Sequence, residues 1–334
     1  MQNYLNVSII IPVYNSEKTI KNTLNKIINE ASKLTSEIIV IDDNSTDNST
    51  KIIKEFGKKI KLIELEKNGG AGNARNSGAL IAKYENLCFI DSDIEIAEDS
   101  IVNLVNRLNL DDCTGSVSAT QNLKNLNTNS WSSDFVCLKS CYGIDKFKDE
   151  VVFSTICSEF CVISKKFFLK LDMWKNVNSA GGEEFDMGYK ILKSNKKNIK
   201  TLSAIYSGYW CSISTRFKRI VDRTSKYIPL LLKKRKFDTK GSFATFEQSL
   251  SSFLTLILAI LLFINFILIG NNLSLIIIFI LIFQYIVELG FLKFVFKNRD
   301  IKMLIFSLFG IHVINLGIIL GVVYFIFRKM FFIK

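Results

Sequence analysis

The first half of the chain alternates short apolar runs with segments whose apolar residues recur every three or four positions. The apolar runs are rich in β-branched residues, which is typical of buried strands. We expect strands at residues 7–13, 37–41, 60–65 and 87–90. We expect helices at 17–31, after a cap at Ser45 or Thr46, and from Gly72 through Ala82. This alternation predicts an α/β layer with a parallel sheet and right-handed crossovers.

The pattern weakens after residue 94, and fewer elements can be predicted there. We expect helices over 100–108 and 185–194, and a helix starting within 165–171. Two short apolar runs favour strands, at 151–154 and 160–164.

The end of the chain is strongly apolar. Three runs are long enough to cross a bilayer, at about 249–269, 273–296 and 303–327. The link at Lys297–Lys302 is basic, so the positive-inside rule places this link and the preceding polar part of the chain in the cytoplasm. If the third run crosses the membrane, its end would lie outside the cytoplasm. The basic residues Arg328, Lys329 and Lys334 at that end favour the cytoplasmic side instead. The third run could therefore span, re-enter or lie at the interface.

A basic amphipathic segment, residues 213–245, precedes the apolar runs. One helical face carries apolar residues and Thr224: Phe217, Ile220, Val221, Thr224, Ile228 and Leu231. The opposite face is basic: Arg216, Lys218, Arg219, Arg223 and Lys226. Such a helix is typical of an anionic membrane surface, and the alternative is a basic helix packed on the folded domain.

The composition argues against a nucleic-acid-binding protein and against a disulfide-bonded one. The 334 residues carry a net charge of +12, but Arg216–Lys240 alone holds ten Lys/Arg against two Asp. The charge is thus mostly local, and no nucleic-acid motif accompanies it. With no secretory signal at Met1 and an odd number of cysteines, seven, we expect a reduced cytoplasmic setting. Two Cys-x₃-Cys pairs have a spacing uncommon for zinc, which favours free thiols.

Polar segments follow each of the first four predicted strands. They begin at Pro12, Asp42, Asn68 and Asp91. Open α/β sheets bind ligands at this edge. Asp91 and Asp93 are two residues apart at a strand end, where carboxylates can hold a hard divalent cation. Each segment alone could be an ordinary turn, but their order after successive strands indicates one site.

The motifs VSIIIPVYNSEKTI, EIIVIDDNSTDNS, NGGAGNARNSGA and LCFIDSDIE resemble family 2 glycosyltransferases of the GT-A fold. The resemblance covers residues 6 to about 190. It implies an α/β, Rossmann-like GT-A catalytic domain at 1–212, then the basic interfacial segment at 213–245. An all-α membrane region with two to three helices would follow at 246–334.

The resemblance also implies donor-binding roles. Three residues would border the nucleotide: Pro12, Tyr14 and Glu17. Asp42 or Asp43 would hydrogen-bond the base or ribose. Gly70 belongs to the glycine-rich turn, and Arg75 would lie near the nucleotide or its phosphates.

By the same resemblance, Asp91 and Asp93 form the DxD motif for Mn²⁺ or Mg²⁺. Asp93 would be the direct ligand, and Asp91 would contact ribose or metal-bound water. The family usually has Glu-Asp where this chain has Glu183-Glu184. Glu184 would then be the catalytic base, supported by Glu183. The alternative is that both acids only favour a helix N-terminus.

Together these features predict a membrane-anchored glycosyltransferase that moves one sugar from a nucleotide-diphosphate sugar, and the resemblance implies that it inverts the configuration. The expected acceptor is lipid-linked, such as a polyprenyl phosphate or lipid-linked oligosaccharide, at the cytoplasmic membrane face. We also expect membrane lipids as partners, and we do not expect nucleic acid as one. Alternatives are a soluble or cell-surface glycan acceptor, a non-catalytic nucleotide-sugar-binding membrane protein, or a small transporter with a regulatory domain.

Overall fold

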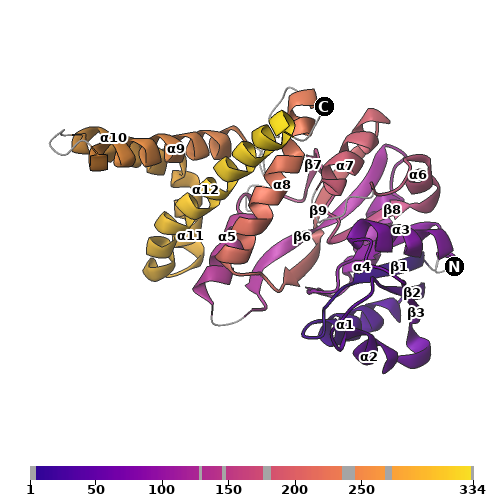
Figure 1. Ribbon diagram of the computed structural model, residues 1–334. Helices are drawn as coiled ribbons and strands as arrows, with labels where there is room; N and C mark the ends of the chain where they lie inside the picture. Colours follow the sequence, from indigo (N-terminus) through magenta and orange to yellow (C-terminus); the bar gives the residue numbers. More distant parts are fainter. Residues whose placement is uncertain are drawn as a thin grey trace. The chain divides into compact units, whose positions relative to one another are not determined.

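The computed structural model describes residues 5–127, 130–144, 148–175, 182–234, 245–267 and 273–331. Gly181, the end of the basic segment at 235–244 and the link Gly270-Asn271-Asn272 lie outside these ranges. The chain forms two compact units (Figure 1). The first, the α/β unit, combines Met1–Leu126 with Ile144–Tyr209. The second, the helical unit, combines Asn127–Gly143 with Trp210–Lys334.

The elements of the α/β unit follow in chain order. Up to the middle of the unit they are β1 (Asn6–Val13), α1 (Ile20–Ala31), β2 (Thr35–Asp42), α2 (Ser49–Lys54), η1 (Gly57–Lys59), β3 (Lys61–Glu64), α3 (Ala71–Ile81) and β4 (Asn86–Ile90). The remainder are β5 (Ile94–Ile96), α4 (Ser100–Leu108), β6 (Thr114–Asn125), β7 (Glu150–Phe153), β8 (Phe160–Ser164), α6 (Lys165–Lys170), α7 (Glu183–Lys193) and β9 (Lys197–Gly208).

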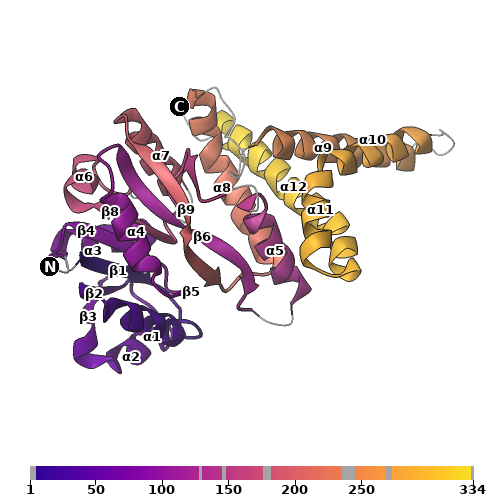
Figure 2. The same ribbon diagram turned by 180° about the vertical axis from the view of Figure 1, so that it is seen from behind.

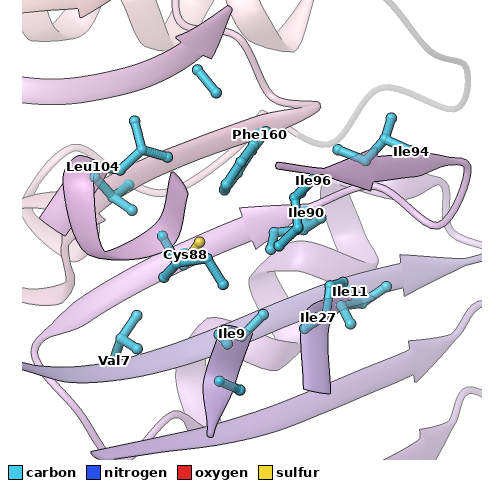
Figure 3. Close-up of a cluster of buried hydrophobic side chains, with 14 of the residues drawn as sticks. Val7, Ile9, Ile11, Ile27, Cys88, Ile90, Ile94, Ile96, Leu104 and Phe160 are labelled. Atoms are coloured by element: carbon cyan, nitrogen blue, oxygen red, sulfur yellow. The ribbon is translucent and has the colours of Figure 1, made fainter. Parts of the chain in front are cut away.

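The first four strands are parallel, in the order β3-β2-β1-β4. β1 is buried on both sides of the sheet, which explains its continuous apolar run. On one side, Ile9 and Ile11 join a core with Ile27 of α1 (Figure 3). On the other side, Ile10 packs in a core with Ala74 of α3. The predicted parallel layer is confirmed for these strands.

The rest of the sheet is mixed, and this was not predicted. β8 is antiparallel to β4, β6 is antiparallel to β8, and β9 is parallel to β6. β5 and β7 are both antiparallel to β9. Within the described residues, the nine strands form one sheet.

The sequence analysis did not predict β5, β6 and β9. For β6 and β9 the reason is that several of their buried side chains are polar. Ser116 and Thr120 of β6 are buried, yet their hydroxyls are satisfied by β9. Ser116 donates to Asn198 Oδ1 over 2.8 Å, and Thr120 donates to the Thr201 carbonyl over 2.7 Å. Because the buried positions are hydroxyl and amide residues, hydrophobic periodicity does not report them.

The helical unit contains α5 (Trp131–Cys141), α8 (Ile213–Lys234), α9 (Phe246–Ile267), α10 (Ser274–Val287), α11 (Leu289–Asn298) and α12 (Ile301–Phe331). Of the described helices, α9 and α12 are long and apolar enough to cross a membrane. The second predicted run is broken at Glu288, where α10 and α11 meet at a bend of 62°. It gives a third candidate span only if these two bent helices cross the membrane together. α5 was not predicted, and it lies inside the range expected for the first domain.

Polar side chains hold three helices of this unit together. Asn315 of α12 is fully buried and donates to Ser251 Oγ (2.9 Å) and Thr255 Oγ1 (3.0 Å) of α9. Gln284 of α10 donates to the same Thr255 Oγ1 over 2.7 Å. His312 Nε2 is 3.2 Å from the Tyr285 hydroxyl, within hydrogen-bond distance. This contact is consistent with a structural role for the histidine.

A close approach of α3 to β1 gives the first prediction. A Cβ on Gly78 would lie 2.5 Å from Cγ2 of the buried Ile10 and 3.4 Å from Cγ1 of Ile41. We expect Gly78→Val to lower the free energy of unfolding by about 1–3 kcal/mol, because both neighbours must shift. Denaturant unfolding of the purified protein would measure this.

The matched control is Leu80→Ala in the same helix, because Leu80 is exposed. We expect its free energy of unfolding to change by no more than about 0.5 kcal/mol. Equal losses in the two variants would contradict the packing described.

Candidate functional site

The loops after β1 and β2 are tied to each other by side chains. Asn15 has a φ of 50°, and its Oδ1 accepts from the Thr46 backbone N–H over 2.8 Å. Glu17 accepts from the backbone N–H and side-chain amide of Asn48, over 3.1 and 3.0 Å. These bonds fix the two loops as one surface at the carboxyl end of the sheet.

Asp42 and Asp43 are both buried and both bond the surrounding loops. Asp42 Oδ1 accepts from the Ser45 backbone N–H over 3.0 Å, and its Oδ2 accepts from the Thr50 hydroxyl. Asp43 accepts from two successive amides, Gly69 N–H at Oδ1 and Gly70 N–H at Oδ2, each over 2.8 Å. Asp43 therefore sets the position of the glycine-rich turn.

The glycine-rich turn leads directly into α3. Gly70 has a φ of 85° and precedes the first residue of this helix. A non-glycine residue would be strained there, because a Cβ disfavours this region of φ. The N-terminus of α3 carries the positive end of the helix dipole and lies at the ligand-binding edge of the sheet.

Arg75, one turn into α3, is buried against Asp91 at the end of β4. Its Nη2 donates to Asp91 Oδ1 over 2.5 Å, and its guanidinium lies 5.7 Å from the ring centre of Trp174. The Trp174 backbone is held by Asn76 through hydrogen bonds of 2.9 and 3.0 Å. Nε and Nη1 of Arg75 are buried without a hydrogen-bond partner among the described residues.

Charges from four elements meet around this pair. Burial opposes the Arg75 charge, but Asp91 foremost, with Glu183 and Glu184, raises the pKa of the guanidinium. Burial also raises the pKa of Asp91, against the lowering effect of Arg75, and Glu159 and Glu183 add to the rise. The two sequence-predicted acids of α7 are thus brought into the same electrostatic site as Asp91.

The acids at the start of α7 differ in exposure. Glu183 is buried, whereas Glu184 is half-buried and accepts from the Ser158 hydroxyl over 2.7 Å. Gly182, with a φ of 118°, precedes them. Both carboxylates lie in the first turn, where the helix dipole favours negative charge.

The other predicted residues lie at the same edge with different exposures. Pro12 is buried within β1, Tyr14 is 49% exposed, and Asp93 is exposed. The backbone carbonyl of Asp93 accepts from Tyr209 N–H over 3.2 Å. Asp91 keeps 24% of its side-chain surface accessible. The aspartates therefore offer carboxylate surface at the loop after β4.

Sequence reasoning missed Glu159, Ser158 and Trp174. Glu159 precedes β8, and its backbone carbonyl accepts from Asp91 N–H over 2.9 Å. Its carboxylate is held by the Tyr206 hydroxyl and by Gln121 Nε2, the latter over 2.7 Å. Only the antiparallel pairing of β8 with β4 brings it to Asp91, and no local motif signals that pairing.

The residues present fit a divalent cation that is shared with an anionic ligand. No group of three or more metal-ligating side chains occurs within the described ranges. Mg²⁺ sites commonly use one or two carboxylates and take further ligands from substrate phosphates and water. Two carboxylates at one loop, next to a buried arginine with two unpartnered nitrogens, suit that arrangement.

The chain is similar to known proteins over its first half. Residues 8–171 match the family model described as "Glycosyl transferase family 2". A poly(ribitol-phosphate) beta-glucosyltransferase of Bacillus spizizenii is 40% identical over 107 residues, covering 30% of this chain and 17% of the relative. A poly-beta-1,6-N-acetyl-D-glucosamine synthase of Staphylococcus epidermidis is 27% identical over 177 residues, covering 50% and 42%. The chain thus matches less than half the length of either relative.

Solved structures extend the likeness in fold. The mannosyltransferase PcManGT from Pyrobaculum calidifontis, in complex with GDP-Man and Mn²⁺, has a TM-score of 0.58 at 14% identity. That match covers 97% of this chain and 87% of the other. GalNAc-T7 with UDP, GalNAc and Mn²⁺ has a TM-score of 0.52 at 20% identity, covering 70% and 48%. The first unit therefore has the GT-A fold.

The two amides bound by Asp43 give a second prediction. In Asp43→Asn the side-chain N–H₂ group faces one of the Gly69 and Gly70 N–H groups, so one acceptor is lost. We expect the free energy of unfolding to fall by about 1–3 kcal/mol, the cost of an unsatisfied buried group. We also expect faster hydrogen exchange at the Gly69 and Gly70 amides.

Glu95→Gln is the matched control, because Glu95 accepts one hydrogen bond at Oε1, from the Tyr209 hydroxyl over 3.1 Å. A glutamine keeps an oxygen for that bond. Unchanged exchange at Gly69 and Gly70 in Asp43→Asn would show that this carboxylate does not hold the turn.

Proposed function

We propose that this chain, whose residues 8–171 match the family 2 glycosyltransferase model, transfers one sugar from a nucleotide-diphosphate sugar to an acceptor at a membrane surface. The single observation that carries this proposal is the joint site of Arg75, Asp91, Glu183 and Glu184 at the carboxyl edge of a GT-A sheet. It combines an anion-binding group, metal-binding groups and carboxylates able to accept a proton.

The donor diphosphate would be bound by Arg75 and the N-terminus of α3. Nε and Nη1 of Arg75 supply donors that have no other partner among the described residues. A guanidinium binds phosphate oxygens well because its donors are planar and paired. Tyr14, Glu17 and Pro12 would border the nucleoside, with the loop of Asp42 and Asp43 beside the base or ribose.

Asp93 and Asp91 would hold Mn²⁺ or Mg²⁺. Such an ion, when bound, neutralises charge on the departing diphosphate. Arg75 would serve the same leaving group from the protein side, and its pairing with Asp91 keeps the carboxylate oriented. Mn²⁺ is present in both similar solved complexes, which supports the choice of metal.

Glu184 would act as the general base. An acceptor hydroxyl loses its proton to a Glu184 oxygen as its own oxygen bonds to the anomeric carbon. The bond from that carbon to the diphosphate oxygen breaks in the same displacement, so the configuration inverts. Ser158, 2.7 Å from Glu184 Oε1, would hold the carboxylate in place. Glu183, buried behind it, would support its position.

A lipid-linked acceptor, such as a polyprenyl phosphate or lipid-linked oligosaccharide, is favoured by the helical unit. This unit includes two helices long and apolar enough to cross a membrane. The α/β unit would lie on the cytoplasmic side, where nucleotide sugars are made. The name of the Bacillus spizizenii relative favours a second candidate, a polymeric acceptor such as poly(ribitol phosphate).

Removing the proposed metal ligand Asp93 tests the metal assignment. We expect Asp93→Ala to abolish sugar transfer, with little remaining when Mn²⁺ is raised. Glu98→Ala, an exposed acid that pairs with Lys33, is the control and should keep full activity. Full activity of Asp93→Ala in a donor-turnover assay would refute the metal assignment.

Glu184→Gln distinguishes the acceptor chemistries. With a hydroxyl acceptor we expect a drop of about 10²–10⁴-fold in kcat, the usual contribution of a general base. With an acceptor that is already a phosphate anion, appreciable activity should remain. An unchanged rate with a hydroxyl acceptor would exclude Glu184 as the base.

The donor itself can be found by thermal stabilisation. A nucleotide sugar at 100 times its Kd should stabilise the folded state by about 2.7 kcal/mol when Mn²⁺ is present. We expect this gain to be lost in Arg75→Gln and reduced in Arg75→Lys, because a lysine keeps the charge but not the paired donors of the guanidinium. If no nucleotide sugar stabilises the wild-type protein, the proposed donor class is wrong.

A further inference from the structure

Glu159 lies directly opposite Asp91 on two neighbouring strands of the α/β unit. β8 lies between β4 and β6 in the sheet, which can be followed in Figure 2. The register pairs Ile90 with Phe160, so the next residues outward are Asp91 and Glu159. The Glu159 carbonyl accepts from Asp91 N–H over 2.9 Å. Because β8 is antiparallel to β4, the start of β8 lies at the same edge of the sheet as the end of β4.

The Glu159 carboxylate is held at one oxygen and open at the other. Its Oε2 accepts from the Tyr206 hydroxyl and from Gln121 Nε2, the latter over 2.7 Å. Tyr206 is 1% exposed, so its hydroxyl is a fixed donor. No hydrogen bond from the described residues reaches Oε1, and the side chain of Glu159 is only half-buried. This oxygen is therefore available to a ligand.

Two acids that face each other across strands are unfavourable by themselves, because like charges directly opposite destabilise a strand pair. Asp91 is bonded to Arg75, whereas Glu159 has no ion pair among the described residues. Its two donors, a hydroxyl and an amide, orient the carboxylate without neutralising it. Natural proteins keep such unfavourable arrangements mainly at functional sites. The free oxygen of Glu159 thus has the character of a ligand contact.

Glu159 also lies between the two halves of the proposed chemistry. On one side is Asp91, which belongs to the proposed metal and diphosphate site. On the other side is Ser158, which donates to Glu184, the proposed base, over 2.7 Å. A single displacement needs the acceptor oxygen, the anomeric carbon and the leaving oxygen nearly in line. The sugar must therefore occupy the space between the base and the diphosphate.

We propose that Glu159 is a specificity-determining residue whose Oε1 accepts a hydrogen bond from a hydroxyl group of the transferred sugar. Tyr206 and Gln121 are then positioning residues, which act on the sugar only through Glu159. A carboxylate suits this task because charge-assisted hydrogen bonds are short and strong. The inference rests on the proposed function and adds to it the part of the site that recognises the sugar of the donor.

The affinity for a nucleotide sugar, compared with that for its own nucleoside diphosphate, tests this inference. Three pairs serve as probes in the presence of Mn²⁺: UDP with UDP-glucose, UDP with UDP-N-acetylglucosamine, and GDP with GDP-mannose. Calorimetry on the full chain in detergent gives both dissociation constants. We expect Glu159→Ala to weaken binding of the nucleotide sugar by about 10–100-fold, the usual worth of a hydrogen bond to a charged group. Binding of the nucleoside diphosphate and of Mn²⁺ should stay unchanged.

Glu159→Gln keeps a polar group of the same length but loses the charge, so it should lose less affinity for the nucleotide sugar than Glu159→Ala. Monodeoxy analogues of the bound donor sugar then identify the contact. We expect one analogue, which lacks the contacted hydroxyl, to bind the wild-type protein and Glu159→Ala equally well. A constant ratio of wild-type to variant affinity over all monodeoxy analogues would overturn the proposal.

Tyr206→Phe tests the positioning role separately. The variant keeps the ring that packs against Phe160, with ring centroids 6.2 Å apart, and removes only the hydroxyl. We expect a loss of about two- to tenfold in affinity for the nucleotide sugar. Adding Tyr206→Phe to Glu159→Ala should cause no further loss, because the hydroxyl acts through the carboxylate. An independent loss in the double variant would contradict that role.

Glu85→Gln is the matched control, because Glu85 is bound at the opposite end of β8. Its Oε1 accepts from the Ser164 hydroxyl and from Lys166 N–H, over 2.5 and 3.1 Å. We expect all measured affinities to stay unchanged in this variant.

Equal losses of affinity for the nucleoside diphosphate and the nucleotide sugar in Glu159→Ala would overturn the proposal, because Glu159 would then act on Asp91 or on the metal. Unchanged affinity for the nucleotide sugar would also overturn it. If Glu159→Ala does not fold, Tyr206→Phe decides by the same comparison. Failure of the wild-type protein to bind any of the probes would instead refute the donor class in the proposed function, and this inference with it.

Discussion

The ion pair between Arg75 and Asp91 is the interaction on which the site depends. A buried guanidinium is stable only with a partner, and Asp91 supplies one at the end of β4. To meet it, α3 must pack closely on β1, and β1 must lie next to β4. The Trp174 ring, whose backbone is held by Asn76, also lies next to the guanidinium. The arrangement of the candidate site therefore depends on how the first four strands are ordered.

We expect the pair to make the proposed site prefer anionic ligands. Two nitrogens of Arg75 have no protein acceptor among the described residues, although three carboxylates raise the pKa of its guanidinium. A ligand with several negative oxygens can use those donors without displacing Asp91. A divalent ion at the same loop would balance the remaining acids, so ligand and metal are expected to bind cooperatively.

Much of the first half of the fold could be predicted because its strands are purely apolar and its helices strictly periodic. β1, α4 and β8 lie within a residue of their expected bounds. β6 and β9 could not be found this way, because their buried positions include Ser116, Thr120 and Asn198. For the site, motif order indicated Arg75, Asp91 and Glu184, whereas Glu159 required knowledge of the β8–β4 pairing. Composition located the apolar helices, but not the break at Glu288.

The assignment of α5 to the helical unit has a practical consequence for dissecting this protein. The chain passes between the units three times, near residues 126, 143 and 209. A fragment that ends at 209 would keep α5 but remove α8, α11 and α12. Phe135, now buried between rings of α11 and α12, would then face water, and Asp134 would lose Arg299. A soluble catalytic fragment would therefore need α5 replaced by a short polar linker, not merely a cut before the apolar tail.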